Sequence, residues 1–278
     1  MFENLSGKQG FLFGILSGMG LTAIIGFSFL TPVLLRNNTV AQNVGGTYQQ
    51  VAQTTPQDTA TVPSAPIPTN IPKTKKPKVE LFVMSKCPYG LQMEKAFVPA
   101  YDLLKKKADF DIKFVSYAMH GKEEVDENTR QYCAQQQDKD KFYKYLDCYS
   151  AEGDTAGCMK LSGLNESKIN SCVDKANKEF GILDKFNDQS TWLSGRYPIY
   201  PIDEELNTKY GVQGSPTLVI NGVQVDAGRT PDAIKSVVCA AFENAPSECE
   251  QALSASSPQP GFGTGLAQNV DSGAACGG

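Results

Sequence analysis

The sequence has 278 residues, of which 41% are hydrophobic and 20% are charged, with a formal net charge of −4. A chain of this composition can bury a sizeable core in one domain with appendages. The basic residues are scattered, which argues against a nucleic-acid-binding surface. Eight cysteines accompany a single histidine, and their spacing is typical of paired cysteines in an oxidising, extracytoplasmic compartment.

An uncharged apolar stretch lies near the start of the chain, over residues 11–35. At roughly 25 residues it is long enough to cross a bilayer as a helix. We therefore expect an uncleaved signal anchor in the cell membrane, with residues 1–10 in the cytoplasm and the rest of the chain outside. A cleaved signal peptide, which would leave a secreted protein, is the alternative.

Two segments have the composition of flexible chain. Residues 36–77 are rich in Gln, Thr, Pro and Asn without periodicity, which is typical of a disordered linker. Residues 251–278 are rich in Ser, Gly, Ala and Pro, so we expect a flexible tail. The segment between them, residues 78–250, carries the pattern of a folded domain.

This folded segment has the pattern of an α/β domain. Strands are expected at 78–84, 110–117, 217–220 and 223–226, and helices at 89–106, within an insertion at 122–190 and from Pro231 onward. Asn221-Gly222 predicts a hairpin turn, and Thr230 is a typical N-cap. Inside the insertion the pattern predicts helices at 126–149, 157–162 and 166–180.

Cys87 stands between the first strand and the first helix, directly before Pro88. Unpaired backbone N–H groups and the helix dipole favour an anion at this position, so a thiol there ionises readily and becomes a nucleophile. An inert buried thiol is the alternative for any single cysteine. Lys86 either adds positive potential or is merely solvated. His120 has no evident partner and is expected to be a loop histidine.

The order of elements and three motifs resemble the DsbA-like branch of thioredoxin-fold thiol–disulfide oxidoreductases, over about residues 78–243. The motifs are Cys87-Pro88-Tyr89-Gly90, Pro99 within the first helix, and Gly214-Ser215-Pro216-Thr217. The resemblance implies a thioredoxin-like fold with a helical insertion and a cis Pro216 opposite Cys87. It also implies that Ser215 and Pro216, with Pro88 and Tyr89, bind a substrate peptide as an added strand.

Six other cysteines are spaced as structural pairs. Four of them lie in the insertion and allow three pairings. Antiparallel helices there favour a nested pairing, and the expected disulfides are Cys133–Cys172, Cys148–Cys158 and Cys239–Cys249. A zinc site is the rival for the four insertion cysteines, but none of them sits in a CxxC pair, so no metal is expected.

Gly90 departs from the family pattern, because a dithiol enzyme carries a second cysteine there to resolve mixed disulfides. With six cysteines assigned to structural pairs, Cys276 is the one left besides Cys87. A flexible tail would let Cys276 reach the active site as a resolving thiol. A stray tail thiol and an intermolecular disulfide are the alternatives.

Together these features predict a membrane-tethered, extracytoplasmic oxidoreductase that acts on protein thiols and disulfides through the Cys87 thiolate, without a bound cofactor. A single motif cysteine favours reduction or isomerisation over a self-contained oxidase cycle. The resemblance implies that a quinone-linked membrane thiol oxidase could recharge the protein. The alternatives are a non-catalytic peptide-binding module or chaperone and, more weakly, a peroxidase-type sensor that forms a sulfenic acid.

Overall fold

Residues 70–268 and 273–277 are described by a computed structural model of the chain. The helices and strands are, in chain order, β1 (Lys78–Val83), α1 (Pro88–Leu104), β2 (Asp109–Phe114), α2 (Lys122–Gln137), α3 (Lys139–Glu152), α4 (Thr155–Ser162), α5 (Glu166–Phe180), α6 (Ile182–Asn187), η1 (Gln189–Thr191), α7 (Glu204–Tyr210), β3 (Gly214–Ser215), β4 (Thr217–Ile220), β5 (Val223–Gln224), α8 (Pro231–Ala240), η2 (Ser247–Glu250) and β6 (Cys276–Gly277).

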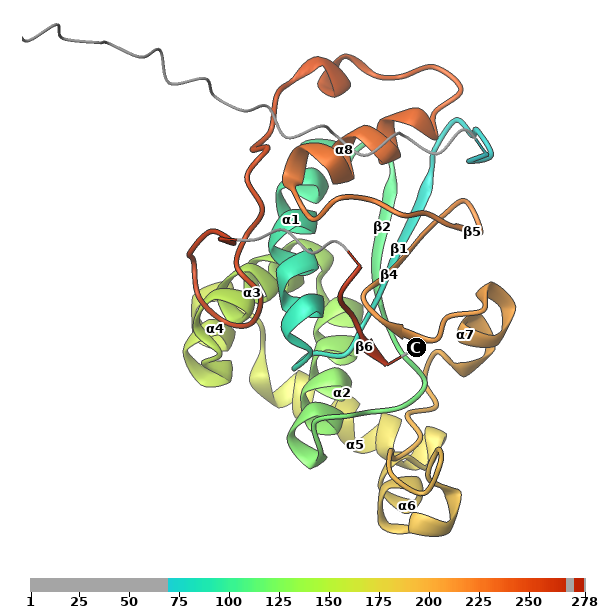
Figure 1. The fold of residues 1–278 in the computed structure, drawn as a ribbon. Helices are drawn as coiled ribbons and strands as arrows, with labels where there is room; N and C mark the ends of the chain where they lie inside the picture. The colour runs from blue at the N-terminus through green and yellow to red at the C-terminus, as the bar shows by residue number, and fades with distance from the viewer. Residues whose placement is uncertain (1–69, 269–272, 278) are drawn as a thin grey trace, which may run out of the picture. The chain divides into compact units, whose positions relative to one another are not determined.

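The central sheet has four strands in the order β2-β1-β4-β5 (Figure 1). Strand β1 pairs in parallel with β2 and antiparallel with β4, and β4 forms a hairpin with β5. Residues 79–83 of β1 are all buried, which is typical of a strand covered on both faces. A βαβ unit followed by a ββα unit is the thioredoxin-like arrangement, so the expected α/β fold is confirmed for the described residues.

Helix α1 carries much of the core and fixes the position of its own N-terminus. It buries large apolar side chains along its length, among them Leu91, Phe97 and Leu104. Phe97 meets Phe110 of β2 edge to face, with ring centroids 5.3 Å apart, and α1 packs against α3 and α8. Burial of one such side chain contributes about 1.5–3 kcal/mol, so the first turn of α1 is held firmly at the end of β1.

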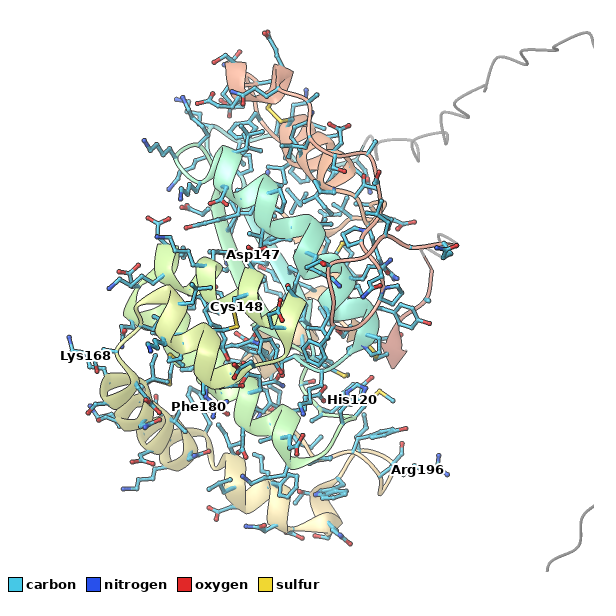
Figure 2. The ribbon with its side chains drawn as sticks, turned by 90° about the vertical axis from the view of Figure 1, so that its left-hand side faces the viewer. His120, Asp147, Cys148, Lys168, Phe180 and Arg196 are labelled. Carbon is cyan, nitrogen blue, oxygen red and sulfur yellow. A yellow bond between two sulfur atoms is a disulfide. The ribbon has the colours of Figure 1, made fainter. Side chains whose placement is uncertain are left out.

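The helical insertion contains α2 to α6 (Figure 2). The single helix expected at 126–149 is wrong, because the chain turns at Asp138. That residue has an extended backbone, ends α2, and caps α3 by accepting a hydrogen bond from the Lys141 N–H at 3.0 Å. The insertion disulfides are Cys133–Cys172 and Cys148–Cys158, the nested pairing favoured by the sequence. A third bond joins Cys239 to Cys249 at the end of α8.

Both ends of the described chain make contacts with the domain. Residues 70–77 pack on the domain, because Ile71 is buried and the Thr74 N–H and C=O pair with Ala241 and Glu243. In the tail, the N–H groups of Gly261 and Gly263 donate to the carbonyls of Pro88 and Ala151, and residues 276–277 pair with β3. The expected membrane span at 11–35 lies outside the described residues. Within residues 70–268 and 273–277, no helix is long and apolar enough to cross a bilayer.

Candidate active site

Cys87 is the N-cap of α1, with Pro88 at the first helical position. Its sulfur accepts a hydrogen bond from the Gly90 N–H at 3.4 Å, and its own N–H donates to the Met84 carbonyl at 2.9 Å. A sulfur at a helix N-terminus, with a backbone N–H pointing at it, is in the environment that stabilises a thiolate. The local sequence produces this arrangement because Pro88 starts the helix where β1 has just ended.

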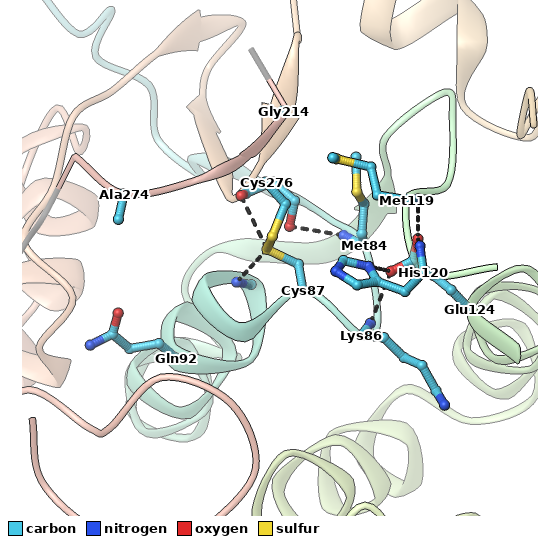
Figure 3. Close-up of a disulfide and its surroundings, with 12 residues drawn as sticks. Met84, Lys86, Cys87, Gln92, Met119, His120, Glu124, Gly214, Ala274 and Cys276 are labelled. Carbon is cyan, nitrogen blue, oxygen red and sulfur yellow. Dashed lines mark hydrogen bonds and ion pairs between the residues drawn. A yellow bond between two sulfur atoms is a disulfide. The ribbon is translucent and has the colours of Figure 1, made fainter. Parts of the chain in front are cut away.

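The sulfur of Cys87 is bonded to that of Cys276, with the two Cα atoms 6.0 Å apart (Figure 3). The tail residue arrives as part of β6, which pairs antiparallel with β3 in the register Ser215 opposite Cys276 and Gly214 opposite Gly277. The tail covers the site, since Cys87 is fully buried and Cys276 is half-buried. The unassigned pair of cysteines therefore forms one disulfide between the helix and the tail.

Ser215 lies directly against this disulfide, and Pro216 follows it in the chain. The peptide bond between them is cis, and the Ser215 carbonyl lies 3.4 Å from the Cys87 sulfur. The buried Ser215 hydroxyl accepts a hydrogen bond from the Met84 N–H at 2.9 Å. The residues that the resemblance assigns to the peptide platform are thus brought together with Cys87, and the tail lies on that platform.

Gly90 is where a second motif cysteine would stand, and the space there is already occupied. A Cβ at Gly90 would come within 2.7 Å of the Ser215 hydroxyl oxygen and 3.1 Å of the Met84 carbonyl oxygen. Contacts this short require the neighbouring atoms to move. The absence of a cysteine at this position is therefore built into the packing between α1 and β3.

Glu124 is a contributor to the site that the sequence did not single out. Its carboxylate is fully buried and accepts hydrogen bonds from the N–H groups of Met119 at 2.8 Å, His120 at 3.2 Å and Lys86 at 3.3 Å. It also pairs with His120 Nδ1. Glu124 thus joins the loop after β2 to the residue before Cys87 (Figure 3). The i, i+4 spacing of His120 and Glu124 was the available signal.

The remaining predicted residues border the platform. Pro88 starts α1, and the Tyr89 ring lies 5.3 Å from the guanidinium carbon of Arg229. Lys86 forms an ion pair with Glu123 at the surface. A cavity of about 350 Å³ lies beside Pro216 and is lined by Met93 and Arg229 among others. In the described part of the chain, no group of His, Cys, Asp and Glu is placed to hold a metal ion.

Comparison with known proteins gives matches only among solved structures. No family model matches the sequence, and no curated protein matches it. DsbA from Mycobacterium tuberculosis aligns with a TM-score of 0.43 and 14% identity, covering 65% of this chain and 94% of its own. DsbG, a disulfide bond oxidoreductase from the same organism, aligns with a TM-score of 0.45 and 15% identity, covering 66% and 93%.

BdbD from Bacillus subtilis aligns with a TM-score of 0.40 and 17% identity, covering 65% of this chain and 92% of its own. The matched structures are thus thioredoxin-fold thiol–disulfide oxidoreductases of the DsbA and DsbG type.

Proposed function

We propose that this protein is a thiol–disulfide oxidoreductase whose redox couple is Cys87 and Cys276. The observation that carries the proposal is the disulfide that joins the helix N-terminus of α1 to the tail on the β3 edge. It supplies a second sulfur to a motif that has glycine at position 90. The couple differs from a CxxC pair because its two sulfurs can separate when the tail strand leaves.

In the reducing direction, the Cys87 thiolate attacks one sulfur of a substrate disulfide. A Cys87–substrate disulfide forms, and the other substrate sulfur leaves as a thiolate that takes up a proton. The Cys276 thiolate then attacks the Cys87 sulfur, forms the Cys87–Cys276 disulfide and releases the second substrate sulfur. The substrate gains two electrons, and the protein loses two.

In the oxidising direction, the same steps run backwards and a substrate dithiol becomes a disulfide. If the Cys87–substrate disulfide is instead attacked by another substrate thiol, the substrate is isomerised and Cys87 is released unchanged. The net direction depends on the partner that resets the couple. A quinone-linked membrane thiol oxidase would reset it as an oxidase, and a dithiol reductant would reset it as a reductase.

The test is disulfide exchange by the purified protein and by its Cys87→Ser and Cys276→Ser variants, followed with a reduced peptide dithiol and its disulfide. We expect the parent to exchange both, and Cys87→Ser to lose activity at least a hundredfold. Cys276→Ser should accumulate a mixed disulfide on Cys87. Equal activity of the parent and Cys87→Ser would overturn the proposal, and peptide binding without exchange would favour the binding-module alternative.

We further propose that the domain works outside the cytoplasm, tethered to the cell membrane by residues 11–35. The four disulfides support an oxidising compartment, and the apolar length of residues 11–35 supports an anchor. The measurement is the N-terminal mass of the protein recovered from membranes after an alkaline wash. Recovery of a shortened chain in the soluble fraction would show that the segment is cleaved.

A further inference from the structure

The contact between β6 and β3 is a main-chain contact that requires a glycine at position 214 of β3. A Cβ at Gly214 would come within 2.7 Å of the Cys276 carbonyl oxygen and 3.0 Å of the Gly277 carbonyl. The backbone of the tail therefore approaches β3 more closely than any side chain at Gly214 would permit. An extended peptide added to a short sheet edge is held by such main-chain bonds, and its side chains set specificity.

Arg229 holds the tail on the other side of its cysteine. Arg229 is 3% exposed, and its guanidinium donates from Nη1 to the Gln92 side-chain oxygen at 3.0 Å and from Nη2 to the Ala274 carbonyl. Ala274 lies two residues before Cys276. A backbone carbonyl is offered by every amino acid, so this contact tolerates any residue at that position.

The Tyr117 side chain leaves no room for a side chain on the residue that follows Cys276. A Cβ on Gly277 would overlap the Tyr117 hydroxyl, which donates a hydrogen bond to the Gln213 carbonyl at 2.6 Å. The Tyr117 ring is nearly buried and lies against Tyr197, so it cannot simply swing away. Gly277 also has a φ of +80°, a region that L-residues with a side chain rarely adopt.

From these contacts we propose that the tail is a tethered pseudo-substrate, and that the site selects substrate peptides in which the reacting cysteine is followed by glycine. The inference deepens the proposed function and rests on it. A substrate peptide takes the place of β6 on β3, with its carbonyl two residues before the cysteine on Arg229. Residues before the cysteine are read through their backbone, and the residue after it is restricted by Tyr117.

The strand β6 can leave β3 and return to it, because residues 259–263 at the base of the tail are held by contacts that do not involve the disulfide. Lys95 donates from Nζ to the carbonyls of Gln259, Gly261 and Gly263 at 2.7–2.8 Å. The Ala267 N–H donates to the Ser257 carbonyl. From Ala267 to Cys276 the chain can extend at most about 30 Å. A tether of that length gives an effective thiol concentration of the order of millimolar, so Cys276 remains in competition with every bound substrate.

The experiment uses the full chain with Cys276→Ser, so that Cys87 is free to react. Two peptides, Ala-Ala-Cys-Gly-Gly and Ala-Ala-Cys-Ala-Gly, are each supplied as a mixed disulfide with thionitrobenzoate. The Cys87 thiolate attacks the peptide sulfur, a Cys87–peptide disulfide forms, and the coloured thionitrobenzoate leaves. We expect the glycine peptide to react at least tenfold faster than the alanine peptide. When Tyr117→Ala is added, the ratio of the two reaction rates should fall several-fold.

A second measurement does not depend on Tyr117→Ala folding correctly. In the otherwise unchanged chain, Gly277→Ala should lower the equilibrium constant for forming Cys87–Cys276 from glutathione disulfide at least tenfold. Ala275→Ser, at the exposed residue before Cys276, should leave it unchanged. Equal rates for both peptides, or no effect of Gly277→Ala, would overturn the inference.

The reaction of the Cys276→Ser chain with dithiobis-nitrobenzoate measures the reactivity of Cys87 without any peptide. It therefore tests the proposed function separately from this inference. If Cys87 reacts with this reagent faster than the thiol of the unfolded chain but does not distinguish the peptides, only the inference fails. If Cys87 reacts no faster than the thiol of the unfolded chain, the proposed function fails with it.

Discussion

At the scale of single residues, Gly90 and Ser215 form one structural unit. Ser215 places its hydroxyl on the Met84 N–H, at 2.9 Å, in the space that a side chain at position 90 would need. The disulfide partner of Cys87 lies in the tail, and the first turn of α1 has a glycine at position 90.

This coupling predicts the outcome of a double-mutant cycle between Gly90→Ala and Ser215→Ala. A helical Gly→Ala change normally stabilises by about 0.5–1 kcal/mol, but here the added methyl meets the Ser215 hydroxyl, so we expect destabilisation of about 1–3 kcal/mol. Ser215→Ala should itself cost about 1–3 kcal/mol, because the buried Met84 N–H loses its acceptor. The double variant should be more stable than the sum by at least about 0.5 kcal/mol.

The cycle is measured by urea unfolding of the oxidised proteins, with all four disulfides intact. Strict additivity of the two changes would mean that the alanine methyl is accommodated without touching Ser215. A stabilising effect of Gly90→Ala alone would contradict the overlap directly.

At the scale of elements, residues 259–263 form a loop that holds the base of the tail on α1 and so keeps Cys276 near Cys87. Its carbonyls surround the Lys95 ammonium, and Phe262 meets Tyr149 edge to face at 5.4 Å. Burial lowers the pKa of Lys95, and the neighbouring Glu94 acts in the opposite direction. Three carbonyl acceptors nevertheless give each ammonium hydrogen a partner.

Removing this anchor should weaken the redox couple without touching either sulfur. We expect Lys95→Met to lower the equilibrium constant for forming Cys87–Cys276 about tenfold, equal to about 1.4 kcal/mol, because the tail loses three charge-assisted hydrogen bonds. A glutathione redox titration measures the constant. Lys106→Met, on an exposed lysine just beyond the end of α1, is the matched control. The same constant in both variants would show that the loop does not position Cys276.

The elements also show which features of the fold were predictable from sequence. Signals that act within a few residues were reliable: Asn221 and Gly222 have positive φ in the β4–β5 turn, and the Thr230 hydroxyl accepts from the Ala233 N–H at the start of α8. Asp138 was missed because an aspartate within a polar helical pattern gives no clear break signal. The order of strands and helices, together with the resemblance of three motifs to a known family, predicted the thioredoxin-like fold.

Contacts between distant residues were the ones that sequence could not give. The tail has the composition of a flexible segment, yet it is fixed by Lys95, which lies 164 to 168 residues before its acceptors. The i, i+4 spacing of His120 and Glu124 was a signal for one contact of Glu124, but only the fold brings the Lys86 N–H to its carboxylate. Predicting Cys276 as a partner of Cys87 was possible only by counting cysteines.

At the scale of the whole molecule, the Cys87–Cys276 bond closes a loop with a sequence separation of 189 residues. In the chain-entropy account, a loop of that size stabilises the folded chain by about 5 kcal/mol. A functional couple must open this bond in every cycle, so the reduced domain has to stay folded without it. The three other disulfides and the sheet core are independent of the tail, and they can hold the domain while the tail strand is released.

The buried carboxyl of Glu94 makes the stability of the whole domain depend on pH. Both of its oxygens lack a hydrogen-bond partner among the described residues. Burial, reinforced by the charge of Glu127, raises its pKa well above the usual value, against a smaller opposing effect of Lys95. A group with a raised pKa in the folded state contributes stability that is complete below its unfolded pKa and is lost as pH rises toward the folded pKa.

Glu94→Gln should remove this dependence, because glutamine has nearly the same shape and does not ionise. We expect the variant and the parent to have similar free energies of unfolding near pH 4. Above that, the parent should fall behind by up to about 1.4 kcal/mol per pH unit until the folded pKa is reached. Urea unfolding from pH 4 to 8 measures the difference, with the exposed Glu152→Gln as control. A constant difference between parent and Glu94→Gln across this range would mean that Glu94 titrates alike in the folded and unfolded chains.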